Sequence, residues 1–228
     1  IVYAGSLVNP ELLNYAPPGC EVHNSASMTL DEVIGTMADG VARGLAVVRL
    51  HTGDPSLYGA IREQMDRLKK LGIAYEVVPG VSSFCAAAAA LNAEYTLPGV
   101  SQTLIVTRME GRTPVPDREN IRSLAAHRAS MALFLSTGMI EPLCVALIEG
   151  GYPAETPAAL VYKASWPEQK ILRARLCELS AGAEAAGIRK TALILVGDFL
   201  GDDYELSRLY DASFSHEFRD AERKDRAL

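Results

Sequence analysis

Short apolar runs alternate along the chain with longer stretches in which apolar residues recur at helical spacing. The runs have the length and composition of buried strands, and they lie at residues 45–50, 73–78, 103–107, 131–136, 158–163 and 191–197. The stretches between them predict helices at residues 30–43, 58–71, 82–93, 118–128 and 139–149. Strands that alternate with helices are typical of βαβ units. The pattern therefore predicts an α/β fold with two α/β domains and mainly parallel sheets.

The periodic pattern breaks at residues 109–117, where the sequence MEGRTPVPD contains one glycine and two prolines. Such a stretch is typical of a linker between domains. We therefore expect an N-terminal domain over residues 1–108 and a C-terminal domain over residues 116–205. The rest of the chain, residues 206–228, becomes highly charged near its end and is expected to form a tail that frays.

Composition narrows the class of protein. Of the 228 residues, 49% are hydrophobic and 22% charged, a globular balance that can bury a substantial core. The formal net charge of -6 argues against nucleic acid as a partner. No run approaches the roughly 18 apolar residues of a membrane helix, so we expect no membrane partner and a cytoplasmic protein. The four cysteines and four histidines lack metal-ligand spacing, so we expect reduced thiols and no metal.

Two tight turns each follow a predicted strand and precede a predicted helix. In the first, Asp54 and Pro55 suit the N-cap and the first position of a helix, and Gly53 permits a close backbone approach. In the second, Ser82 or Ser83 suits the cap position. Ligands of open parallel sheets bind beyond the carboxyl ends of the strands. The two turns together indicate a ligand held by main-chain groups, although each alone is equally well explained as a plain capped turn.

Several other chemistries lack their sequence motifs. The chain contains no GxxxxGK[ST] loop and no intact GxGxxG after a strand, which argues against P-loop and standard dinucleotide sites. It also contains no GxSxG elbow and no HExxH helix. Hydrolysis by an activated serine and zinc catalysis therefore have no support.

Three segments carry a resemblance to a known family: TGDPSLYGAI (52–61), VPGVSS (78–83) and LVYKASWPEQ (160–169). This combination resembles the tetrapyrrole methylases, which transfer a methyl group from S-adenosylmethionine to corrin precursors. The resemblance extends from residue 1 to about residue 201. It implies a homodimer with two α/β domains in each subunit and the active site in the interdomain cleft. It also implies a tetrapyrrole substrate and S-adenosylhomocysteine as the second product.

Further segments narrow the resemblance within the family. The sequences VYAGSLV (2–8), VTRMEGRTPVP (106–116) and FLSTG (134–138) are similar to those of members that methylate carbon 11 of the corrin ring. The family also has an opening strand and a Gly-rich turn of the GAGPGD kind ahead of the Tyr3-Ala4-Gly5 segment. The printed sequence does not contain them, so we expect the N-terminal domain of this chain to lack both.

The resemblance implies which residues bind the cofactor, mostly through their main-chain groups. These are Thr52, Gly53, Asp54, Leu57, Ser82, Ser83, Thr137, Ala164 and Thr191. Arg108 and Arg112 of the predicted linker are candidates for binding the carboxylates of the substrate through forked hydrogen bonds. No catalytic residue is assigned, because methyl transfer depends mainly on the alignment of donor and acceptor.

Three alternatives stay open at this point. One is an ordinary nucleotide-binding domain, which the missing phosphate motifs disfavour. A sister methylase of the same fold would act on another tetrapyrrole position, on a protein or on ribosomal RNA, and the acidic charge argues mildly against RNA. A non-catalytic α/β protein would bind S-adenosylmethionine without transferring its methyl group.

Overall fold

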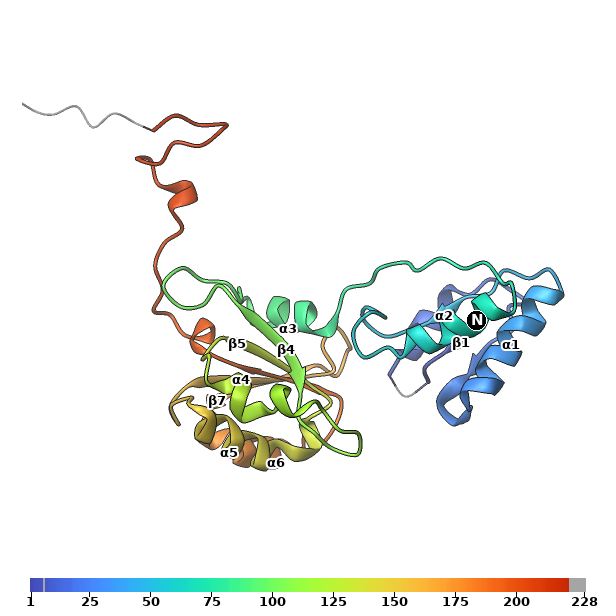
Figure 1. Ribbon diagram of the computed structural model, residues 1–228, viewed down its shortest axis with the longest axis horizontal. Helices are drawn as coiled ribbons and strands as arrows, with labels where there is room; N and C mark the ends of the chain where they lie inside the picture. The colour runs from blue at the N-terminus through green and yellow to red at the C-terminus, as the bar shows by residue number, and fades with distance from the viewer. Residues whose placement is uncertain (6, 222–228) are drawn as a thin grey trace, which may run out of the picture. The chain divides into compact units, whose positions relative to one another are not determined.

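The computed structural model describes residues 1–5 and 7–221 and divides into two compact units, Ile1–Ala86 and Ala87–Leu228 (Figure 1). Each unit combines a sheet with helices, so the predicted α/β fold is confirmed. The division falls within helix α3 (Ser83–Leu91), ahead of the boundary expected near residue 108. The loop at residues 109–116 therefore connects elements of the second unit. The last part of the predicted tail, residues 222–228, lies outside the described residues.

The first unit is built on a three-stranded parallel sheet with the strand order β2-β1-β3. The strands are short: β1 is Val2–Tyr3, β2 is His23–Asn24 and β3 is Arg49–Leu50. Helices α1 (Leu30–Ala42) and α2 (Ile61–Lys70) lie where the apolar periodicity predicts them. The apolar faces of β1 and α1 form the core of this unit, from Val2, Val33, Ile34 and Met37.

Two strands predicted for the first unit are reduced or missing. Of residues 45–50, only Arg49 and Leu50 join β3, and residues 73–78 form no strand. Within the described part of the chain, no ladder pairs with residues 73–78. A strand exists only with a hydrogen-bonded neighbour, so apolar composition alone does not make one. Val77 and Val78 of this segment are accordingly exposed.

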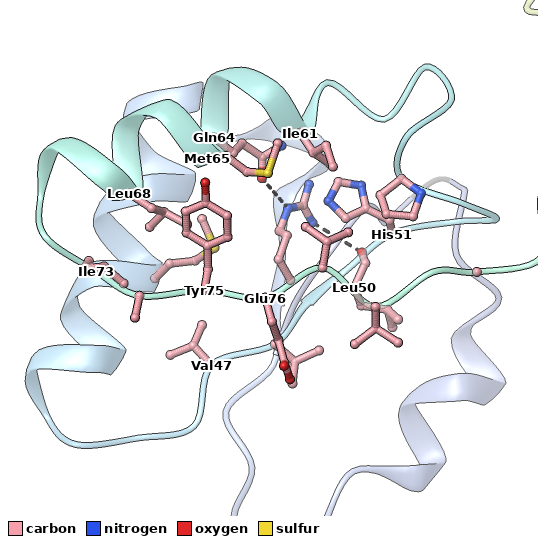
Figure 2. Close-up of a pocket in the computed structure, with 18 of the residues that line it drawn as sticks. Val47, Leu50, His51, Ile61, Gln64, Met65, Leu68, Ile73, Tyr75 and Glu76 are labelled. Atoms are coloured by element: carbon pink, nitrogen blue, oxygen red, sulfur yellow. Dashed lines mark hydrogen bonds between the residues drawn. The ribbon is translucent and has the colours of Figure 1, made fainter.

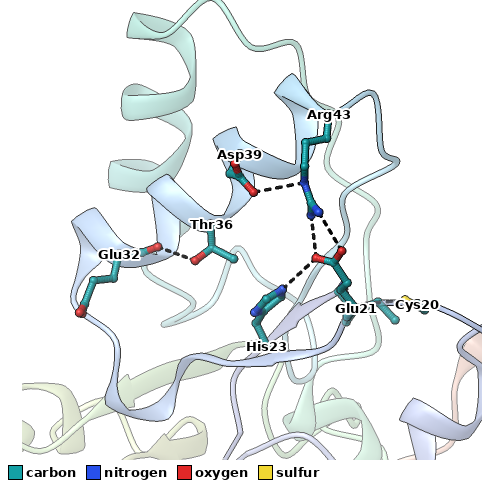
Figure 3. A network of polar contacts seen from close by, with 8 residues as sticks. Cys20, Glu21, His23, Glu32, Thr36, Asp39 and Arg43 are labelled. Atoms are coloured by element: carbon teal, nitrogen blue, oxygen red, sulfur yellow. Dashed lines mark hydrogen bonds and ion pairs between the residues drawn. The ribbon is translucent and has the colours of Figure 1, made fainter.

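A surface network joins β2 to the C-terminal end of α1 (Figure 3). Arg43, which caps α1, donates to both carboxylate oxygens of Glu21 at 2.9 and 2.6 Å, and its Nε lies 3.2 Å from Asp39. His23 Nε2 lies 3.6 Å from the same Glu21 carboxylate. The Arg43 guanidinium holds the pKa of Glu21 below its usual range. Exposed pairs of this kind stabilise a fold little, so we expect this network to add little to the free energy of unfolding.

The second unit contains a five-stranded sheet with the order β4-β5-β8-β6-β7. Its strands are β4 (Leu104–Arg108), β5 (Ser130–Phe134), β6 (Pro157–Tyr162), β7 (Lys170–Arg175) and β8 (Ala192–Val196). Only β4 and β5 pair in parallel, whereas the other pairs are antiparallel. The prediction of a mainly parallel sheet is therefore wrong for this unit. The connection from β6 to β7 is too short for the crossover that parallel strands require.

Helices α4 (Ile121–Ala125), α5 (Ile140–Gly150) and α6 (Leu179–Ala185) lie along one face of this sheet (Figure 1). The core between them is fully buried and includes Met131, Leu133, Leu143, Leu147, Leu160 and Ile194. Short 3₁₀ helices lie at Pro10–Tyr15, Ser25–Ser27, Asp117–Glu119, Thr137–Met139, Leu176–Glu178, Asp198–Leu200 and Arg208–Tyr210. Among the described residues, no helix is long and apolar enough to cross a membrane.

Replacing glycine with alanine should have opposite effects at Gly150, where α5 packs against α4, and at Gly35 of α1, where there is open space. A Cβ at Gly150 would lie 2.5 Å from the backbone oxygen of Arg122 and 2.6 Å from Cβ of Ala125. Gly150→Ala should therefore lower the free energy of unfolding by about 1–3 kcal/mol. Gly35, exposed on α1, has nothing within 4 Å of an added Cβ. Gly35→Ala should raise that free energy by about 0.5–1 kcal/mol. Urea unfolding measures both, and equal effects at the two positions would contradict the packing.

Candidate functional site

The carboxylate of Asp54 joins the two predicted turns of the first unit, residues 52–58 and 78–82. Its Oδ1 accepts hydrogen bonds from the backbone N–H and the hydroxyl of Ser56, and its Oδ2 accepts the backbone N–H of Gly80 at 2.9 Å. These bonds, the Ser56 hydroxyl first, hold the pKa of Asp54 below its usual range. The prediction that Asp54 caps a helix is wrong, because α2 begins only at Ile61. A separate turn intervenes, and the carboxylate bridges it to the second turn.

The two turns also touch through their backbones. A Cβ at Gly80 would lie 2.1 Å from the carbonyl oxygen of Gly53, a distance that no side chain tolerates. Gly53 has a φ of +60°, and a Cβ there would lie 3.4 Å from Cα of Ser82 and from the backbone nitrogen of Ser83. Helix α3 begins at Ser83, and the first N–H groups of a helix have no intrahelical partner. The arrangement therefore places the N-terminal end of α3 beside the first turn.

The rest of the first turn is tightly wound. The Leu57 N–H donates to the carbonyl of Asp54 at 3.2 Å, and a Cβ at Gly59 would lie 2.2 Å from the carbonyl of Pro55. Tyr58 and Ala60 have left-handed backbones, with φ of +56° and +49°. Such conformations cost energy in residues with side chains and gather at functional sites. The strain supports a ligand-binding role for this loop over that of a plain connection.

An apolar cavity of about 590 Å³ adjoins both turns and reaches Gly53 and Gly80 (Figure 2). Its walls come from α1, α2, β3 and residues 73–78. Arg49 lies half-buried in this wall and donates to Gln64 Oε1 at 3.2 Å and to the Val2 carbonyl at 3.0 Å. Burial and, secondly, the Arg49 charge lower the pKa of His51. The cavity therefore has a mainly apolar lining, to which Arg49, His51 and Glu76 add a guanidinium, an imidazole and a carboxylate.

Three predicted residues of the second unit lie together at one end of its sheet. Thr137 follows β5, Ala164 follows β6, and Thr191 precedes β8, which runs antiparallel to both strands. The Thr137 hydroxyl donates to the carbonyl of Ala192 at 2.8 Å, and the Lys163 N–H donates to the carbonyl of Thr191 at 3.0 Å. Residues far apart in the sequence thus form one continuous edge.

The same edge carries a concentration of left-handed backbone. Leu135, Lys163, Ser165 and Thr191 have φ of +53°, +46°, +70° and +57°. Residues with a Cβ rarely adopt these angles. Like the loop of the first unit, this edge holds strained main chain where the resemblance implies contacts to a cofactor.

Comparison with known proteins places the chain in a family. The family described as Tetrapyrrole (Corrin/Porphyrin) Methylases matches residues 1–180. The chain belongs to the tetrapyrrole methylases. A relative from Methanocaldococcus jannaschii named cobalt-precorrin-4 C(11)-methyltransferase is 53% identical over 225 residues, which are 98% of this chain and 87% of that protein. A Mycobacterium tuberculosis relative named precorrin-4 C(11)-methyltransferase is 44% identical over 93% of this chain and 85% of its own length.

A solved structure agrees with this assignment. The X-ray structure of cobalt precorrin-4 methyltransferase, a cobalamin biosynthetic enzyme, matches with a TM-score of 0.86 and 48% identity. The match covers 88% of this tetrapyrrole methylase and 84% of that chain. In the described part of the chain, no group of three or more His, Cys, Asp or Glu side chains is placed to hold a metal ion.

The two arginines suggested for substrate binding have different surroundings in this tetrapyrrole methylase. Arg108 ends β4 and donates to the carbonyls of Thr113 at 3.1 Å and Pro114 at 2.7 Å, so it shapes the loop at residues 109–116. Arg112 is exposed on that loop. Sequence reasoning missed the fully buried Ser136, whose hydroxyl accepts the Met109 N–H at 2.9 Å and anchors the loop to β5. An isolated serine gives no sequence signal for such a role.

Replacing Asp54 tests the bridge between the turns. An asparagine has one oxygen and one NH₂ group, so it cannot accept from both Ser56 and Gly80. Asp54→Asn and Asp54→Ala should therefore each weaken binding of S-adenosylhomocysteine by roughly tenfold. Ser56→Ala keeps the two backbone donors and should change affinity by less than about threefold. Isothermal calorimetry on the three variants decides the matter, and an Asp54→Asn variant that binds as tightly as the wild type would refute the bridge.

Proposed function

We propose that this protein transfers a methyl group from S-adenosylmethionine to carbon 11 of precorrin-4, or of its cobalt form, in cobalamin biosynthesis. The observation that carries this proposal is the similarity over almost the whole chain to the two relatives named as C(11)-methyltransferases. The segments at residues 2–8, 106–116 and 134–138 support the same position of methylation. The wound and bridged turns agree with it, because a loop that served only as a connection would not need them.

The described residues fit S-adenosylmethionine. Gly53 and Gly80 bring two backbones together where a Cβ would collide, and α3 begins beside them. We propose that the first unit binds the cofactor through Thr52, Gly53, Asp54, Leu57, Ser82 and Ser83. Thr137, Ala164 and Thr191 are proposed to supply further contacts from the sheet edge of the second unit. Small residues and glycine suit recognition by main-chain amides and carbonyls.

The chemistry needs little from side chains. When bound, S-adenosylmethionine supplies a methyl group on a positively charged sulfur, which is already activated for displacement. The protein's part is to hold the reactants in line and to exclude water, and such positioning contributes roughly 7–11 kcal/mol to catalysis. The Asp54 carboxylate is occupied by hydrogen bonds from Ser56 and Gly80, so we assign it to holding the loop and not to removing a proton.

The loop at residues 109–116 is proposed to meet the carboxylates of the substrate. Arg108 directs its guanidinium to the carbonyls of Thr113 and Pro114, which argues for a role in shaping the loop. Arg112 is exposed on the loop that Arg108 shapes. A guanidinium suits a substrate that carries several carboxylates, since it forms forked hydrogen bonds. We therefore assign the direct contact to Arg112.

A mass assay tests the proposed reaction. The protein is incubated with S-adenosylmethionine carrying a labelled methyl group and with precorrin-4, cobalt-precorrin-4 or uroporphyrinogen III. We expect a gain of one labelled methyl group on a precorrin-4 form and none on uroporphyrinogen III. Methylation of uroporphyrinogen III alone would identify a sister methylase. Binding of the cofactor without methylation of any macrocycle would identify a non-catalytic binding protein.

We further propose that the protein acts in the cytoplasm as a homodimer, as the family resemblance implies. Exposed apolar side chains near the described C-terminal end support an interface, among them Leu206 and Tyr210, each 82% exposed, and Phe218, 87% exposed. Static light scattering at micromolar concentration should give about twice the chain mass of 24.5 kDa. A mass equal to that of one chain would contradict the dimer and leave the proposed reaction untouched.

A further inference from the structure

The connection between β6 and β7 folds over the side chain of Lys163. The Lys163 Nζ lies 4.6 Å from the ring centroid of Trp166 and 5.6 Å from that of Tyr162. It also lies 3.5 Å from Glu168 Oε1, and the Lys163 side chain is only 21% exposed. An ammonium over an aromatic face is attracted by the negative face of the ring. Tyr162, Trp166 and Glu168 thus form a cage around the ammonium.

The residues of the cage belong to a turn with an unusual backbone. Lys163 and Ser165 both have left-handed φ angles, and Ala164 lies between them. The Trp166 N–H donates to the carbonyl of Lys163 at 3.0 Å, and the Ser165 N–H donates to Gln169 Oε1 at 2.9 Å. Residues with a Cβ leave such angles unless their surroundings hold them there. The hydrogen bonds to the backbone and the caged ammonium both hold residues 163–165 in this conformation.

The turn is joined to the sheet edge described above. The backbone N–H of Lys163 donates to the carbonyl of Thr191, and the Thr137 hydroxyl donates to the neighbouring carbonyl of Ala192. A change in the path of residues 163–165 therefore moves Ala164 relative to both threonines. Ala164, Thr137 and Thr191 are the three residues of the second unit that are proposed to contact the cofactor.

We propose that Lys163 is a positioning residue of the cofactor site, which acts by holding Ala164 in place through its caged ammonium. The inference rests on the proposed function, because that function supplies the cofactor that Ala164 would contact. The ammonium is occupied by the two rings and the Glu168 carboxylate, so Lys163 acts through the turn and does not itself bind the substrate. The ring of Trp166 contributes more than Glu168, because the Glu168 side chain is 59% exposed and water screens its charge.

Four variants of the full chain separate this role from simple loss of charge. Lys163→Met keeps the apolar stem without the cation, and Lys163→Arg keeps a cation that stacks on tryptophan. Trp166→Phe weakens the cage while the lysine remains. Lys170→Met, at the exposed start of β7, makes the same substitution outside the cage. The measurements are the dissociation constant for S-adenosylhomocysteine, KM and kcat for S-adenosylmethionine, and the melting temperature.

We expect Lys163→Met to raise the dissociation constant and KM roughly tenfold, with kcat changed less than about threefold. Trp166→Phe should raise the dissociation constant by about threefold, whereas Lys163→Arg and Lys170→Met should match the wild type within about twofold. The melting temperature of all four variants should stay close to that of the wild type. A purely structural role would instead lower the melting temperature without separating KM from kcat.

Two results would overturn the inference. If Lys163→Met binds S-adenosylhomocysteine as the wild type does, the ammonium does not position the turn. If Lys163→Arg is as impaired as Lys163→Met while Trp166→Phe binds normally, Lys163 contacts a ligand directly and the cage is incidental. Failure of the wild type itself to bind S-adenosylhomocysteine at millimolar concentration would refute the proposed function instead, so the two failures are distinguishable.

Discussion

The first unit depends on the contact between the backbones of Gly53 and Gly80. A Cβ at Gly80 would overlap the Gly53 carbonyl, and the left-handed φ of +60° at Gly53 disfavours any residue with a side chain there. The Asp54 carboxylate closes the contact by accepting the Gly80 N–H, and its charge strengthens that bond. The start of α3 follows within a few residues, so this pair of glycines sets where the N-terminal end of the helix lies relative to the first turn.

The second unit reaches a similar result by a different route. Its sheet edge has no comparable pair of glycines, and the main chain is directed by left-handed residues at Lys163, Ser165 and Thr191. The ladder between β6 and β8 ends at the pair Tyr162 and Ala192, immediately beside these residues. A regular ladder on one side and the caged lysine on the other hold the strained backbone. Both units therefore present main-chain groups in tight turns. In the first unit two glycines allow the turns to meet, and in the second unit a turn and a sheet edge hold left-handed residues that carry side chains.

The sequence predicts the local elements of this protein better than their partners. Apolar periodicity locates α1 and α5 because each presents a single face to a core. It fails at residues 73–78, since a strand depends on a neighbour that the periodicity of one segment cannot specify. It also misses β7, whose three basic residues leave no long apolar run, and the direction of β8. Asp54 shows the same limit: its place before a helical pattern suggests a cap, but its partner Gly80 lies 26 residues away.

The same distinction explains why side-chain motifs identify this site so poorly. A site that recognises its ligand through amides and carbonyls leaves few chemical side chains in the sequence, and its signals are glycine, proline and small residues in turns. Taken singly, Ala164 and Thr191 look like strand core. They become candidate site residues only in the folded chain, where the sheet brings them to one edge and the hydrogen bonds from Lys163 and Thr137 fix that edge. In such a site, the residues most sensitive to substitution are those whose side chains are smallest or point away from the ligand, because they determine where the backbone lies.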